Sequence, residues 1–288
     1  MVTCINQKGG VSKSTTSEAL ADGLTLKGYH TLLIDLDAQG SVSLTAGAVL
    51  NGSTIYEVLT KRCTAQEAIQ QRTHYNAHEV EQNDTHEDAQ VYAHEVEQEF
   101  KRNYSHTATR ADIIPASQQL AKIDIELTGI GKEHRLREQL KPLLTQYAYI
   151  VIDTPPALGL LTVNALTVAN YVIIPSQADV YSMQGIHQLA ETVEAVREYT
   201  NPELKLAGIL LTRHNARSIL SRDMTDTAKE TADKIETFLY KTVIREGVAV
   251  KEAQANCLSI FEYAPKSNPA ADYAAFVEEF LKRGIQNV

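Results

Sequence analysis

Two lysines and a pair of glycines near the start of the chain, in the stretch Asn6–Thr16, are the first residues that could do chemistry. A short apolar run, Val2–Ile5, precedes this stretch and a helical pattern follows it, which predicts a strand, a glycine-bearing turn and a helix. There the backbone N–H groups of the turn and of the helix start point at one spot and favour an anion such as phosphate. Lys13 would reach that phosphate, and the Ser14 hydroxyl would contact Mg²⁺. The residues expected to form the cradle are Gly9, Gly10, Val11, Ser12, Lys13, Ser14 and Thr15.

Three carboxylates follow two strongly apolar runs of the sequence. Asp35 and Asp37 come at the end of the run Thr31–Ile34, and Asp153 ends the run Tyr149–Ile152. Such runs are typical of buried parallel strands, and ligands bind at the carboxyl ends of these strands in open α/β sheets. We therefore expect these carboxylates close to the phosphate cradle.

The turn resembles the deviant P-loop K-G-G-x-G-K-[ST] of the ParA/MinD class of ATPases, with Lys8 as the additional lysine and Ser12 in place of the last glycine. The segment 35–41 resembles the D-x-D-P-Q-G-N segment of this class. The segment 152–166 is similar to the ParA segment I-D-x-P-P-S-L-G-L-L-T-x-N-A-L. Further stretches similar to ParA landmarks are 182–185, 218–222 and 261–267. On these motifs the chain resembles the ParA/Soj chromosome and plasmid partition ATPases over nearly its whole length, apart from an insertion.

The resemblance implies an enzyme that hydrolyses ATP to ADP and phosphate, slowly without a partner, with ATP and Mg²⁺ as cofactors. The implied catalytic residues are Lys8, Lys13 and Asp37. Lys8 would reach the nucleotide of a second subunit, and Asp37 would position the attacking water. The implied metal-side residues are Ser14, Asp35 and Asp153, with a structural role as the alternative for Asp35. Residues beside the adenine are implied at Thr212 and Arg213.

The resemblance also implies a homodimer that forms with ATP and binds DNA without sequence preference through phosphate contacts. A ParB-type centromere-binding protein would stimulate hydrolysis and so release the DNA. The candidate DNA contacts are Arg217, Arg222, Arg245, Lys251 and Lys266. The chain departs from the ParA motif I-P-R-N-V-R-L-S-E-A-P at 244–254, where a proline and an arginine of the motif are displaced or lost. The base contact and the DNA contacts are therefore left open at this point.

Strand and helix patterns alternate along the chain. The predicted strands are 2–5, 31–35, 111–116, 149–153, 171–175, 206–212 and 241–244. Apart from the helix after the cradle, the predicted helices are at about 55–61, 118–127, 133–147, 183–199 and 270–283. This alternation predicts an α/β fold of one domain over residues 1–288, P-loop NTPase-like, with a twisted, mainly parallel sheet and helices on both faces.

An acidic segment at about 74–106 interrupts this pattern. It holds eight acidic and two basic residues, so it carries −6 of the net charge of −9 and leaves −3 for the rest, which allows a local basic face elsewhere. The hexapeptide A-H-E-V-E-Q occurs in it twice, at 77–82 and 93–98. Such a composition is typical of a solvated helix or a mobile insertion, with metal binding by the histidines as the alternative.

The composition, 43% hydrophobic and 22% charged, is that of a soluble globular protein. Because no apolar run is long enough to span a membrane, we expect a cytoplasmic protein without a membrane partner, associated with the nucleoid in its ATP state. The three cysteines have no C-x-x-C spacing, which predicts neither a disulfide framework nor a zinc or iron–sulfur site. Two alternatives are a MinD-like membrane-cycling ATPase, which needs a basic amphipathic tail, and a nucleotide-gated scaffold whose hydrolysis is impaired by Ser12.

Overall fold

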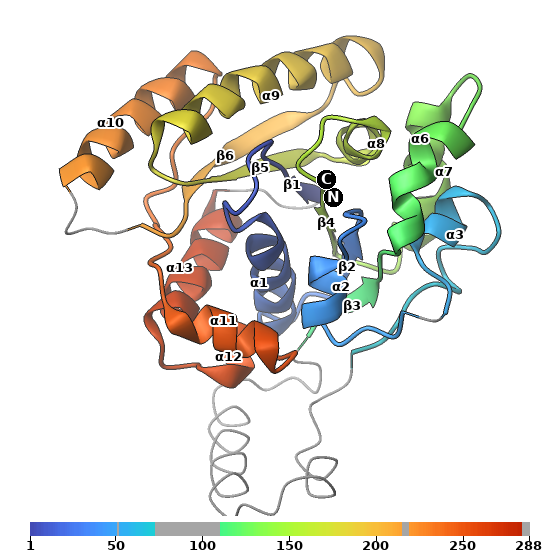
Figure 1. Ribbon diagram of the computed structural model, residues 1–288, viewed down its shortest axis with the longest axis horizontal. Coiled ribbons are helices and arrows are strands. Elements are labelled where there is room, and N and C mark those ends of the chain that lie inside the picture. The colour runs from blue at the N-terminus through green and yellow to red at the C-terminus, as the bar shows by residue number, and fades with distance from the viewer. Residues whose placement is uncertain (51, 73–109, 215–218, 284–288) are drawn as a thin grey trace, which may run out of the picture.

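The computed structural model describes residues 1–50, 52–72, 110–214 and 219–283, without the side chains of 180, 181, 183, 184 and 219–223 (Figure 1). Within these residues, six strands form one sheet in which every neighbouring pair is parallel. The strand order is β3-β2-β4-β1-β5-β6. The strands are β1 (Val2–Cys4), β2 (Thr31–Asp35), β3 (Asp112–Ile114), β4 (Tyr149–Asp153), β5 (Tyr171–Ser176) and β6 (Lys205–Leu211). The predicted fold class is confirmed.

Helices cover both faces of the sheet because successive residues of each buried strand point to opposite sides. Leu33 and Val151 face a core shared with helices that lie below the sheet in Figure 1, whereas Ile34 and Ile152 face the other side. The first layer consists of α1 (Lys13–Leu26), α11 (Val248–Ala255), α12 (Ile260–Tyr263) and α13 (Asn268–Lys282). The opposite layer includes α3 (Ile55–Leu59), α6 (Ile123–Glu126), α7 (Arg135–Leu140), α8 (Leu160–Val168), α9 (Val180–Tyr199) and α10 (Ile219–Lys234).

Two predicted helices are broken into shorter pieces. The segment 118–127 forms the 3₁₀ helix η1 (Gln118–Lys122) followed by α6, and the segment 133–147 forms η2 (Lys132–His134), α7 and η3 (Lys141–Leu143). Pro142 lies at the start of η3, where it removes an N–H donor and prevents a continuous α-helix.

The strand predicted at 241–244 is wrong. On either side of this segment the chain lies beside β6 or the residues that follow it, where it forms two isolated parallel bridges, Ile209 with Leu239 and His214 with Arg245. Between these bridges the N–H groups of Lys241 and Thr242 donate to the carboxylate of Glu279 on α13, at 3.0 and 2.9 Å. Since those donors are used by a helix side chain, the regular ladder is interrupted.

The last described helix, α13, packs against the helix that follows the phosphate cradle. Its residues Phe276, Val277 and Phe280 are fully buried. A Cβ added to Gly23 of α1 would come within 2.7 Å of Val277 Cγ2, so glycine is needed for the two helices to approach this closely. Among the described residues, the longest and most apolar helices still fall short of what a membrane span requires.

The acidic segment predicted at about 74–106 lies outside the described residues, but its two flanks are anchored. Arg72 Nη2 lies 2.5 Å from Asp22 Oδ1, and Arg110 Nη2 lies 3.2 Å from Glu18 Oε1. All four side chains are buried, and burial raises the pKa of the Glu18 carboxyl to about 7. Both flanks are therefore tied to the same helix, α1.

Candidate active site

The turn between β1 and α1 has the backbone shape of an anion cradle. Gly10 has a φ of 76° and Ser12 a φ of 62°, both in the left-handed region. A Cβ added at Gly9 or Gly10 would meet no atom within 4 Å, so the space in front of the turn is open. Ser12 is the N-cap of α1 and its side chain makes no capping hydrogen bond. A serine here adopts, with some strain, the conformation that glycine adopts freely.

Side chains from two other strands hold the turn from behind. The Thr212 hydroxyl, after β6, donates to the carbonyl of Val11 at 3.0 Å, and the Gln177 amide, after β5, donates to the carbonyl of Gly10 at 2.9 Å. Val11 and Thr212 are buried and do not line the space in front of the turn. The structure therefore places these two predicted nucleotide contacts as supports of the cradle.

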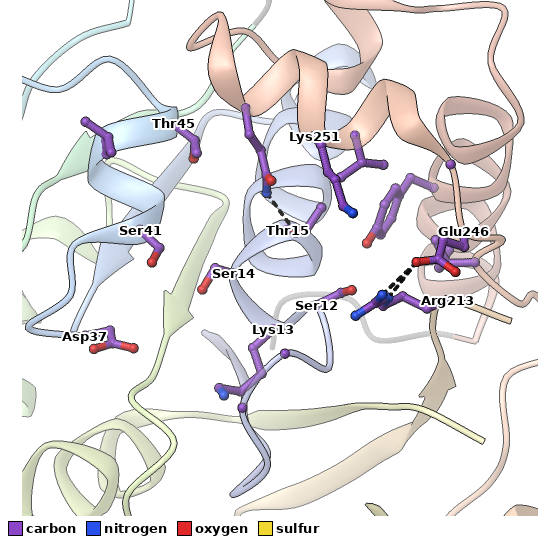
Figure 2. A pocket seen from close by; sticks show the side chains of 18 of the residues that line it. Ser12, Lys13, Ser14, Thr15, Asp37, Ser41, Thr45, Arg213, Glu246 and Lys251 are labelled. Carbon is purple, nitrogen blue, oxygen red and sulfur yellow. Dashed lines mark hydrogen bonds and ion pairs between the residues drawn. The ribbon is translucent and has the colours of Figure 1, made fainter. Parts of the chain in front are cut away.

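A cavity of about 510 Å³ lies in front of the turn (Figure 2). The β1–α1 turn and the start of α1 form its floor and contribute Lys13 and Ser14. Asp37 and the short helix α2 (Ser41–Thr45) form one end. The other end is formed by residue Arg213, which follows β6, and by the segment 244–254. These four segments are far apart in the sequence and meet at the carboxyl edge of the sheet, as expected for an open α/β fold.

Lys13 offers this cavity a buried cation. Its Nζ donates to the carbonyl of Lys8 at 3.4 Å, and no ion pair of Lys13 is found within the described residues. Burial lowers the pKa of the Lys13 ammonium, while the nearby carboxylates of Asp153 and Asp37 act in the opposite direction. A buried cation is stabilised by an anion, so this geometry fits a bound phosphate.

Asp153 and Ser14 place oxygen donors beside Lys13. The Ser14 hydroxyl donates to Asp153 Oδ2 at 2.8 Å, and the Ser17 hydroxyl donates to Asp153 Oδ1 at 2.9 Å. Burial, followed by the charge of Asp35, raises the pKa of Asp153 to about 7. Hydroxyl and carboxylate oxygens suit Mg²⁺. No cluster of three His, Cys, Asp or Glu side chains that could hold a metal occurs in the described part of the chain, so Mg²⁺ would also need water or phosphate oxygens.

Asp35 and Asp37 lie in the same loop but differ in their surroundings. The carboxylate of Asp35 is fully buried and accepts hydrogen bonds from the Asp37 N–H at 3.0 Å and from the Ser43 N–H and hydroxyl at 2.9 and 2.7 Å. Burial raises the pKa of Asp35 to about 6. These bonds favour the structural alternative for Asp35, whereas the Asp37 side chain faces the cavity (Figure 2).

Lys8 is held by a partner that the sequence analysis missed. Its Nζ lies 2.6 Å from Asp179 Oδ2. Asp179 is the N-cap of α9 and also accepts hydrogen bonds from the Ser182 N–H and hydroxyl. Burial would raise the pKa of Asp179, but the hydrogen bonds from Lys8 and Ser182 outweigh it and hold that pKa below its usual value. An aspartate directly before a helical pattern was the available signal.

The end of the cavity formed by Arg213 and the segment 244–254 carries several charged side chains. Arg213 Nη2 lies 2.6 Å from Glu246 Oε1 (Figure 2), and Arg245 Nη2 lies 2.6 Å from Asp272 Oδ1. Arg245 and Lys251, predicted as DNA contacts, line this cavity. The predicted contact Lys266 does not line the cavity, and the side chains of Arg217 and Arg222 are outside the described residues.

A glycine turn that opens a helix at the carboxyl edge of a parallel sheet, with a buried lysine facing an open cavity, defines the class of P-loop nucleotide-binding proteins. Residues 1–82 and 73–206 match a family model described as an AAA domain. The sporulation initiation inhibitor protein Soj of Bacillus subtilis is 34% identical over 286 residues, covering 99% of each chain. The chromosome partitioning protein ParA of Myxococcus xanthus is 32% identical, covering 98% of this chain and 88% of that protein. This chain belongs to the ParA/Soj family of partition ATPases.

A solved structure shares the fold. Cobyrinic acid a,c-diamide synthase from Mycobacterium smegmatis, crystallised with ADP and magnesium, superimposes with a TM-score of 0.75 at 27% identity. The match covers 99% of this chain and 94% of that protein, so the two folds correspond from end to end.

Proposed function

We propose that this protein is an ATP-dependent partition switch. In this proposal two copies close into a homodimer only with ATP and Mg²⁺ bound, the dimer binds DNA without sequence preference, and hydrolysis stimulated by a ParB-type protein releases the DNA. The observation that carries the proposal is the pair of lysines in one turn, with Lys13 facing the cavity and Lys8 held by Asp179 on α9. Because Lys13 lines the cavity of its own subunit and Lys8 does not, Lys8 is available to contact the nucleotide of a second subunit.

The residues around the cavity fit ATP and Mg²⁺. The backbone N–H groups of the turn and the Lys13 ammonium would bind the phosphates, and the Ser14 hydroxyl with Asp153 would hold the metal, directly and through water. Bound Mg²⁺ would neutralise charge between the terminal phosphates. The ADP and magnesium in the M. smegmatis protein support this assignment.

Asp37 is proposed to orient the water that attacks the terminal phosphate. Its side chain is partly exposed at the end of the cavity beside Ser14, and the Gln39 N–H fixes its Oδ1 at 3.0 Å. A carboxylate held in this way can accept a hydrogen bond from water without leaving its position. Turnover is expected to stay slow until the partner protein binds.

Lys8 is proposed to give the dimer its dependence on ATP. On closure its ammonium would leave Asp179 and reach the phosphates of the other subunit, so the dimer is favoured only while those phosphates carry their full charge. Two subunits would then present their bases to DNA together, which strengthens a salt-sensitive attraction that one subunit provides weakly. Association with the nucleoid in the cytoplasm would follow.

Sedimentation velocity in the presence of Mg²⁺ with ATP or ADP tests this proposal. We expect wild-type protein to dimerise with ATP and not with ADP, Lys8→Ala to bind ATP but remain monomeric, and Asp37→Ala to accumulate as an ATP dimer. An Asp37→Ala protein that stays monomeric with ATP would overturn the proposed switch.

A further inference from the structure

Four cations of the described residues line the cavity, and two of them form ion pairs. Arg213 forms an ion pair with Glu246, and Arg245 forms one with Asp272. Within the part of the chain that the structure describes, Lys13 and Lys251 form no ion pair in direct contact, although the charge of Lys251 helps Arg213 to lower the pKa of Glu246. Lys13 has a proposed role at the terminal phosphates, which leaves Lys251 as a cation of this site without an assignment.

Lys251 lies at the end of the cavity opposite Asp37. It belongs to α11, and Gln254, three residues later on the same helix face, donates to the Thr15 hydroxyl at 3.1 Å. Figure 2 shows the Lys251 side chain extending from α11 toward Thr15, with Asp37 at the opposite side of the cavity. Lys251 therefore faces the start of α1 one to two residues beyond Lys13.

The order of the phosphates in the cavity follows from these positions. Lys13 reaches the β- and γ-phosphates of a nucleotide in a P-loop, and Asp37 and Ser14 mark the terminal phosphate end. The α-phosphate of a bound nucleotide would then lie toward Thr15, at the end formed by α11. A lysine side chain is long and flexible and acts as a point charge for a phosphate.

We propose that Lys251 is a nucleotide-binding residue that contacts the α-phosphate. This inference rests on the proposed function, because it needs a nucleotide in the cavity. The family motif I-P-R-N-V-R-L-S-E-A-P has serine at the position of Lys251, so the contact is a feature of this chain. It replaces the sequence-based prediction that Lys251 binds DNA.

The α-phosphate assignment predicts a particular pattern of ligand affinities. ATP, ADP and AMP all carry an α-phosphate, whereas adenosine carries none. Loss of the Lys251 charge should lower the binding affinities for ADP and for AMP by the same factor, about tenfold, which corresponds to ~1.4 kcal/mol of binding free energy. Adenosine should be unaffected. Lys251 therefore sets affinity for both nucleotide states of the switch and does not sense the γ-phosphate.

Titration calorimetry on the full-length chain, by direct binding of ADP and by competition with AMP and adenosine, tests the assignment. We would compare wild type with Lys251→Gln, with Lys251→Arg, which keeps the charge, and with Lys234→Gln. Lys234 is exposed on α10 and does not line the cavity, so its change alters net charge alone. We expect equal losses for ADP and AMP in Lys251→Gln, near wild-type affinity in Lys251→Arg, and no change in Lys234→Gln.

Three results would overturn the assignment. Unchanged ADP affinity in Lys251→Gln together with weaker binding of a DNA duplex in the ATP state would restore the DNA contact. A loss shared equally by adenosine would place Lys251 at the ribose or the base, or in a structural role. A wild-type protein that does not bind ADP would reject the proposed function itself, and this assignment with it, before any Lys251 variant is compared.

Discussion

Replacing Asp179 by asparagine tests how Lys8 is held before two subunits close. The Asp179 carboxylate accepts a hydrogen bond from Lys8 Nζ at 2.6 Å and caps α9 through the Ser182 N–H at 2.9 Å. Asparagine has nearly the same shape and caps helices about as well as aspartate, so the change mainly removes a charge. If Lys8 must leave Asp179 to reach the other subunit, the Asp179→Asn protein should form a tighter ATP dimer.

The expected size of this effect follows from the exposure of the pair. The side chains of Lys8 and Asp179 are 32% and 28% exposed. Ion pairs at exposed sites contribute ~0.2–1 kcal/mol, and partial burial with direct contact places this pair at ~1 kcal/mol. The dimer contains two copies of the Lys8–Asp179 ion pair, so breaking both ion pairs costs ~2 kcal/mol. The Asp179→Asn change should therefore lower the dimer dissociation constant by about 30-fold.

Sedimentation equilibrium with ATP and Mg²⁺ measures that constant, with Asp37→Ala as the common background so that hydrolysis does not disturb it. Asp226→Asn is the matched control, since Asp226 is exposed on α10 and its change removes the same charge. High salt should reduce the difference in dimer dissociation constant between the Asp179→Asn and Asp226→Asn proteins, because salt screens the Lys8–Asp179 ion pair. Weaker dimerisation of Asp179→Asn would refute the reasoning and show that Asp179 holds Lys8 in the orientation used by the dimer.

Other changes test the cradle and the buried charges. Lys13→Ala should lower ADP affinity by at least about 100-fold in calorimetry, because the phosphates lose a buried cation. Ser12→Gly should raise the free energy of unfolding by ~0.5–1 kcal/mol in urea titrations, since glycine adopts a φ of 62° without strain. Burial raises the pKa of Glu18 to about 7, so its favourable contribution is complete below about pH 4.5 and is lost as pH rises through 7. Unfolding titrations from pH 5 to 8 should show a decline in the free energy of unfolding that is up to ~3 kcal/mol larger in wild type than in Glu18→Gln, and equal slopes would contradict this.

The two strands that carry the carboxylates of the site, β2 and β4, were predictable because each is an uninterrupted apolar run ending in an aspartate. The predicted bounds 31–35 and 149–153 are those of β2 and β4. The segment 241–244 has an equally good strand pattern but does not form one, because Glu279 of α13 takes its N–H groups. No local pattern shows that a side chain from the last helix competes for those donors.

The floor of the cavity was also predictable, because its residues are contiguous and their types and spacing indicate a phosphate-binding turn. Side-chain partners that come from distant segments of the chain could not be predicted. Asp179 lies 171 residues from Lys8, and Gln254 lies 239 residues from Thr15. The sequence indicated the charge of Lys251 but not that its side chain lines the cavity, which depends on how α11 packs.

The central claim is that one nucleotide site controls whether the protein holds DNA. Fluorescence anisotropy of an arbitrary labelled duplex, titrated with the protein in the presence of ATP and Mg²⁺, of ADP and Mg²⁺, or without nucleotide, tests it most directly. We predict binding with ATP alone, weakening steeply as salt is raised. Binding of equal strength in all three states, or in none of them, would contradict the claim.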